Sequence, residues 1–176
     1  MNWLPFEACH GRAPAGLLPW LAEPGLLTAR VRAAAGDATR FRMLRLQSAP
    51  LAPELQARLA VADTTCLLRE IEFSCLDVRW IFAQSAFPDS TVARYPWLED
   101  LGDTPLGEAL HRIEGVERDP LEYAQLPAGH SLRRNAAEGG VALLWARRAV
   151  YRLAGAPIVV QELFLPGLGR CGAREE

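Results

Sequence analysis

Apolar and polar residues alternate along several stretches of the chain, which is the pattern of half-buried β-strands. Four stretches share it: residues 64–75, 80–87, 145–153 and 158–165. An arginine-rich segment, residues 41–47, predicts one more strand. The connections at 76–79 and 154–157 are short enough for β-hairpins, and strands joined by hairpins form an antiparallel sheet.

Helix signals fall between these strands. Residues 25–35 predict a helix that ends at Gly36, because glycine readily adopts the backbone conformation that follows a helix. Residues 53–60 predict a short helix that begins with a proline. A further helix is expected to start with Thr104 as its N-cap and Pro105 in its first position.

Residues 124–140 lose all periodicity and gather glycines, so a mobile surface loop is expected there. No repeat or linker divides the chain. We therefore predict a single α+β domain over residues 1–176, with one antiparallel sheet and helices as connections or covers.

Composition narrows the function classes. The chain has 176 residues, 50% of them hydrophobic, which is enough for one domain with a core. The net charge of -2 argues against a nucleic-acid partner. All 19 Lys+Arg residues are arginine. The lack of lysine excludes Schiff-base chemistry, pyridoxal-phosphate chemistry and a Walker-type phosphate loop.

Targeting and redox signals are few. The N-terminus lacks the basic and apolar regions of a signal peptide, and the apolar stretch 13–22 is too short to span a membrane. The histidines show no metal-ligand spacing. We expect a cytoplasmic protein without a metal, whose scattered cysteines are reduced thiols. These cysteines are Cys9, Cys66, Cys75 and Cys171.

Three charged residues fall on the apolar faces of their strands. Alternation places Arg69, Arg147 and Glu162 among hydrophobic neighbours, whereas Glu70 and Glu72 point to the opposite face from Arg69. An unpaired buried charge costs several kcal/mol, so each of the three needs a partner. Two alternatives remain open: Arg69 and Glu162 form a structural ion pair, or the charges line a polar pocket that clamps carboxylates and receives a hydroxyl.

Eight short segments stand out in order from about Trp20 to Pro166. They are WL at 20–21, LLT at 26–28, CLLREI at 66–71, WIFA at 80–83, PDST at 88–91, LGDTPLG at 101–107, WARR at 145–148 and ELFLP at 162–166. This ordered set resembles the chorismate pyruvate-lyase family, which provides the first enzyme of bacterial ubiquinone synthesis.

The resemblance implies an antiparallel sheet with helical flaps over an internal ligand site. It implies a cofactor-free carbon-oxygen lyase that converts chorismate to 4-hydroxybenzoate and pyruvate. Carried over by position, the ligand contacts are Leu27, Arg69, Leu106 and Glu162. Two of these, Arg69 and Glu162, are charged residues that alternation alone already placed on the apolar faces of their strands.

The expected roles follow from the substrate's groups. Arg69 and Glu162 are the candidate catalytic residues: Arg69 clamps a carboxylate, and Glu162 exchanges a hydrogen bond with the ring hydroxyl. The backbone N–H of Leu106 offers a donor in the first turn of a helix. Leu27 packs on the ring as part of a flap. Arg147 either holds the second carboxylate or has a structural or solvated role.

The sequence also departs from the family pattern. Leu27 replaces a common methionine, Gln84 an arginine and Ala149 a serine, and the 124–140 segment is longer than usual. Two rival functions remain: a non-catalytic effector-binding domain of the kind found in transcription regulators, and an inactive paralogue of the lyase. The residues before Trp20 are too few for a helix-turn-helix, which favours the enzyme. We expect a monomer whose partners are chorismate and 4-hydroxybenzoate.

Overall fold

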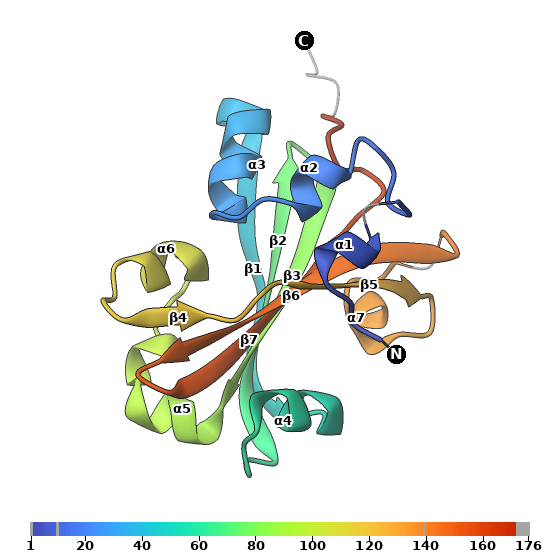
Figure 1. Cartoon of the computed structure of the whole chain (residues 1–176). Coiled ribbons are helices and arrows are strands. Elements are labelled where there is room, and N and C mark those ends of the chain that lie inside the picture. Colours follow the sequence, from blue (N-terminus) through green and yellow to red (C-terminus); the bar gives the residue numbers. More distant parts are fainter. Residues whose placement is uncertain (1, 10, 139, 172–176) are drawn as a thin grey trace.

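A computed structural model describes residues 2–9, 11–138 and 140–171 of the chain. His10 and Gly139, which entered the predictions about metal ligands and the loop, lie outside these ranges. The described residues form one seven-stranded sheet in the order β1-β2-β3-β7-β6-β4, with β5 also paired to β6 (Figure 1). Every pairing between neighbouring strands is antiparallel, as the hairpin pattern predicted.

The long strands agree with the alternating segments of the sequence, and the two predicted hairpins are the β2–β3 and β6–β7 pairs. The strands are β1 (Thr39–Pro50), β2 (Thr65–Cys75), β3 (Val78–Pro88), β4 (Val116–Arg118), β5 (Glu122–Pro127), β6 (Leu143–Leu153) and β7 (Ala156–Phe164). The helices are α1 (Phe6–Cys9), α2 (Leu18–Leu21), α3 (Leu27–Ala35), η1 (Gly36–Ala38), α4 (Pro53–Leu59), α5 (Asp89–Arg94), η2 (Pro96–Leu98), α6 (Leu106–His111) and α7 (Ser131–Asn135).

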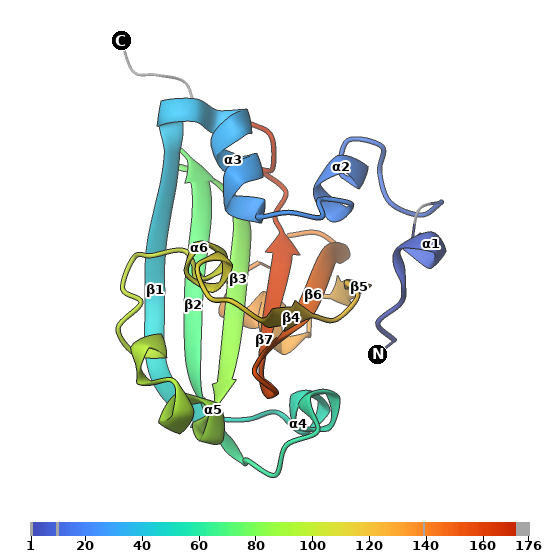
Figure 2. The same ribbon diagram turned by 60° about the vertical axis from the view of Figure 1, so that its left-hand side comes forward.

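One face of the sheet carries two separate apolar clusters. At one end α2 and α3 pack on the strands, with Leu21, Leu27 and Val31 at the contact. At the other end the segment from α5 to α6 packs through Leu98 and Leu106. Figure 2 shows both α3 and α6 in front of the β2 and β3 strands, with α3 above α6. The two covers leave the middle of this face for a cavity.

The opposite face has the same division. The α4 helix packs on one end through Leu55 and Leu59, and α7 packs on the other through Leu132. Between these two clusters lies a row of buried polar side chains that crosses the sheet: Glu70, Gln84, Gln161 and Arg148. Gln84 donates a hydrogen bond to Glu70 at 2.9 Å. Gln84, one of the three positions that depart from the family pattern, is therefore directed away from the cavity.

The prediction of a mobile loop over 124–140 is wrong in its described part. The β5 strand pairs with β6 across this region, and α7 follows it. Arg133 is fully buried and donates hydrogen bonds to the carbonyl oxygens of Leu126, Val141 and Ala142. A single arginine thus joins the end of β5 to the segment that precedes β6. Periodicity fails to detect such an arrangement, because it depends on one side chain and not on alternation.

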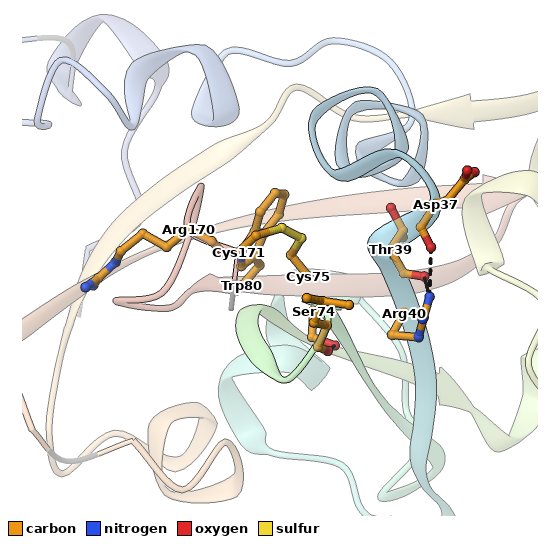
Figure 3. Close-up of a disulfide and its surroundings, with 9 residues drawn as sticks. Asp37, Thr39, Arg40, Ser74, Cys75, Trp80, Arg170 and Cys171 are labelled. Carbon is orange, nitrogen blue, oxygen red and sulfur yellow. Dashed lines mark hydrogen bonds between the residues drawn. A yellow bond between two sulfur atoms is a disulfide. The ribbon is translucent and has the colours of Figure 1, made fainter. Parts of the chain in front are cut away.

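Two further predictions need correction. The α6 helix begins at Leu106, and Pro105 in the preceding N-cap position makes no side-chain cap hydrogen bond, so Thr104 is not the cap. Cys75 and Cys171 form a disulfide, whereas reduced thiols were predicted (Figure 3). The chain folds back after β7, and the indole of Trp80 donates to the carbonyl oxygen of Arg170. This contact brings together two cysteines that are 96 residues apart in sequence.

Among the described residues, no helix combines the length and the apolarity that crossing a membrane requires.

Candidate functional site

A cavity of about 50 Å³ lies between the two apolar clusters on the α3 side of the sheet. Side chains from four strands form its floor, and two helical segments cover it. Leu27, Arg69, Leu106, Arg147 and Glu162, which are the residues predicted to bind the substrate, all line this cavity. The fold therefore brings together side chains that are spread over 136 positions of the sequence, from 27 to 162.

Arg69 lies on β2 and is only 1% exposed. Its Nη2 donates to the carbonyl oxygens of Gly102 and Thr104, both at 2.8 Å, in the segment that leads into α6. Its Nε is buried and has no hydrogen-bond partner in the part of the chain that the structure describes. Burial lowers the pKa of Arg69 to about 10, partly opposed by the charge of Asp103. The guanidinium therefore stays charged at neutral pH and retains a donor for a ligand.

Glu162 and Arg147 lie directly opposite each other on β7 and β6. The Nε of Arg147 donates to Oε2 of Glu162, and its Nη1 donates to the carbonyl oxygen of Glu23 at 2.9 Å. Burial disfavours the charged guanidinium, but Glu162 outweighs it and the pKa of Arg147 is raised. The alternative in which Arg69 and Glu162 neutralise each other is therefore wrong. Glu162 is paired with Arg147, and Arg69 is held by backbone carbonyls.

Sequence reasoning missed three polar residues of the cavity: Thr28, Ser85 and Tyr151. Ser85 is 4% exposed and stands directly opposite Arg69 in the β2–β3 pairing. The signal that found Arg69 would also have found Ser85, because serine stands on the otherwise apolar face of its strand. Burial and the nearby charge of Glu162 raise the pKa of Tyr151, so its hydroxyl stays neutral at physiological pH.

Two segments cover the cavity, and we call them the α3 flap (residues 22–35) and the α6 flap (residues 101–113). Leu26 of the α3 flap packs so closely on Gly107 of the α6 flap that a Cβ atom at 107 would lie 2.8 Å from Leu26 Cδ2. Ligand sites for drug-sized molecules usually have volumes of about 300–1,000 Å³. The volume enclosed here is much smaller, so a ligand of that size would not fit unless the walls of the cavity move.

The fold and the cavity define the class of protein. In this class, one face of an antiparallel sheet and the helical segments packed on it enclose a binding site. Within that class, the chain belongs to the chorismate lyase family, whose profile matches residues 1–169.

Curated relatives agree with this assignment. The probable chorismate pyruvate-lyase of Thiobacillus denitrificans is 35% identical over 172 residues, covering 95% of this chain and 90% of the relative. The chorismate pyruvate-lyase of Erwinia tasmaniensis is 34% identical over 170 residues, covering 94% of this chain and 86% of the relative.

Solved structures with a similar fold come from transcription regulators. The C-terminal domain of PhnF aligns with a TM-score of 0.59 at 12% identity, over 73% of this chain and 83% of that domain. A GntR-family regulator from Bacillus cereus aligns with a TM-score of 0.57 at 10% identity, over 74% of this chain and 93% of that one. At these identities the similarity establishes the fold alone.

Proposed function

We propose that this protein is a chorismate pyruvate-lyase, a carbon-oxygen lyase that converts chorismate to 4-hydroxybenzoate and pyruvate and supplies the former to ubiquinone biosynthesis. The observation that carries the proposal is that Arg69 lines the same cavity as Glu162 and that its buried Nε has no hydrogen-bond partner among the described residues. A buried polar atom without a partner costs free energy, and a ligand carboxylate would recover it.

The reaction itself needs little from the protein beyond positioning. The bond between the ring carbon and the ether oxygen breaks, while the hydrogen on the neighbouring hydroxyl-bearing carbon moves to the methylene carbon of the departing enolpyruvyl group. That group leaves as pyruvate and the ring becomes aromatic. A cyclic transfer of this kind is accelerated by holding the reactive conformer and by stabilising the charge that shifts onto the oxygen.

The residues have distinct roles in this proposal. Arg69 binds the ring carboxylate, and the backbone N–H of Leu106, which is free of the helix's own hydrogen bonds, is a further donor. Glu162 accepts a hydrogen bond from the ring hydroxyl, and Leu27 packs on the ring. Arg147 is a positioning residue, because its donors hold Glu162 and the backbone carbonyl of Glu23 in the α3 flap.

Incubation of the purified protein with chorismate tests the proposal, with 4-hydroxybenzoate followed by absorbance and pyruvate by a coupled dehydrogenase. We expect equal amounts of the two products without added metal, and loss of turnover in Arg69→Ala with the fold retained by circular dichroism. Arg40→Ala is the matched control, because Arg40 is exposed and, within the described part of the chain, its side chain donates only to the nearby carbonyls of Asp37 and Thr39. Binding of chorismate without turnover would instead support an effector-binding domain or an inactive paralogue.

A further inference from the structure

A second, outer cavity of about 370 Å³ adjoins the central one. The two cavities share part of their walls, namely Gly25, Leu26, Gly107, Leu110 and Tyr151. The first four of these belong to the two flaps, and Tyr151 belongs to β6. The outer cavity therefore meets the central one where the two flaps contact each other.

The charges of the two cavities differ. In the central cavity Arg69, Arg147 and Glu162 give a net charge of +1. In the outer cavity the ionisable side chains among the described lining residues are His111, Arg118 and Tyr151, without a carboxylate. The net positive charge of the central cavity can thus neutralise one carboxylate of a ligand. In the outer cavity, Arg118 can pair with a second carboxylate.

Arg147 is poorly placed to bind that second carboxylate. It is 3% exposed, its Nε is paired with Glu162, and its Nη1 donates to the backbone carbonyls of Trp20 in α2 and Glu23 in the α3 flap. Recruiting it would break these bonds and leave Glu162 as an unpaired charge, which is costly in a buried site.

Arg118 has the required position. It is the last residue of β4 and stands directly opposite Tyr151 in the β4–β6 pairing. It donates through Nη1 to the carbonyl oxygen of Pro24 at 2.9 Å, and its charge partly opposes the rise in the pKa of Tyr151. Arg118 therefore lines the outer cavity next to Tyr151, which lines both cavities.

We propose that Arg118 binds the second carboxylate of a dicarboxylate substrate in the outer cavity, while Arg69 holds the first in the central cavity. This inference rests on the proposed function and identifies the second carboxylate as that of the enolpyruvyl group. The product 4-hydroxybenzoate has one carboxylate and occupies only the central cavity. Arg118 therefore distinguishes substrate from product, and loses its ligand when pyruvate leaves.

The test compares the two ligands in one variant. Arg118→Gln should raise the KM and the Kd for chorismate about 10- to 100-fold, because it removes a charge-assisted hydrogen bond. The Kd for 4-hydroxybenzoate, measured by quenching of tryptophan fluorescence, should change less than about twofold. Arg69→Gln should weaken the binding of both ligands. Arg112→Gln is the control for the loss of a positive charge. Arg112 is exposed, directly follows α6 and is not among the lining residues of either cavity.

The results also separate this inference from the proposed function. If the wild-type protein turns over chorismate and Arg118→Gln leaves its KM unchanged, or weakens both ligands equally, the inference is wrong and the lyase proposal stands. If the wild-type protein neither binds nor converts chorismate, both fail. If Arg118→Gln does not fold, Arg118→Lys replaces it, because lysine keeps the positive charge but lacks the planar guanidinium group. The KM of this variant for chorismate should rise severalfold, while its Kd for 4-hydroxybenzoate should stay unchanged.

Discussion

Arg32 on α3 and Glu108 on α6 form an ion pair that joins the two flaps, with 2.5 Å between Nη1 and Oε1. The side chain of Arg32 is 57% exposed and that of Glu108 is 24% exposed, so the pair lies on the outer surface of the closed site. Together with the contact between Leu26 and Gly107, it joins the two flaps over the cavity.

Removing this pair should speed ligand release without changing the chemistry. Exposed ion pairs contribute about 0.2–1 kcal/mol, so Glu108→Gln should raise the dissociation rate of 4-hydroxybenzoate by up to about fivefold. The difference from wild type should shrink as salt screens the pair. Stopped-flow fluorescence measures the rate, and Glu114→Gln, a change at an exposed residue directly after the same flap, is the control. Identical rates for Glu108→Gln and wild type at low salt would show that the pair does not hold the flaps.

The pairing of Arg147 with Glu162 leads to a prediction about stability. Arg147→Gln leaves Glu162 without its cation in a site where the arginine side chain is 4% and the glutamate side chain 17% exposed. Breaking a buried pair from one side costs about 3–5 kcal/mol, mostly through the charge that remains. The double variant Arg147→Gln/Glu162→Gln should therefore be more stable than Arg147→Gln alone in urea unfolding. A double variant as unstable as the sum of the single changes would show that the two side chains are not coupled.

The ion-pair network on the opposite face predicts the response to acid. Burial disfavours the charged forms of Asp119 and Glu122, but hydrogen bonds and charges from Arg58, Arg148 and Arg152 outweigh it and lower the pKa of both carboxyls. A carboxyl with a lowered pKa adds stability above its unfolded pKa of about 4, and this stability is lost as pH falls through the folded pKa.

The unfolding free energy should accordingly decrease below about pH 4. Arg58→Gln should lower the free energy of unfolding by about 1 kcal/mol at pH 7, a modest amount because the ion pairs are partly exposed. The free energy of unfolding of this variant should also fall less steeply as the pH is lowered. Urea titrations at pH 7 and at pH 3 measure both effects, with Arg40→Gln as an exposed control. A variant with an unchanged pH dependence would contradict a role for Arg58 in holding these carboxylates.

The disulfide between Cys75 and Cys171 should stabilise the fold. It closes a loop with a sequence separation of 96, and crosslinks of this kind typically contribute about 2–4 kcal/mol by restricting the unfolded chain. Cys171→Ser should therefore lower the urea midpoint, and a reductant should lower that of wild type but not that of the variant. After unfolding without reductant, a thiol reagent should detect two thiols, those of Cys9 and Cys66. Detection of four thiols would show that the bond is absent.

Some features of the site could be predicted from the chain because they depend on local periodicity. In an extended strand, side chains alternate between faces, so the position of Arg69 among apolar neighbours already determines the face on which it lies. The same holds for Arg147 and Glu162. The antiparallel sheet could be predicted for a similar reason, since a two- to four-residue connection between strands permits a hairpin and no crossover.

The choice of partners was decided by tertiary structure. Alternation shows that Glu162 needs a cation but not which one, because Arg69 and Arg147 lie on the same face of the sheet. The pairing register of β6 with β7 places Arg147 opposite Glu162, and the approach of the α6 flap provides carbonyl oxygens for Arg69. The burial of Arg133, the Cys75–Cys171 bond and the juxtaposition of Arg118 with Tyr151 likewise join segments whose proximity no short window of sequence encodes. Local pattern thus determined which face each side chain takes, whereas the packing of distant segments determined what each one meets there.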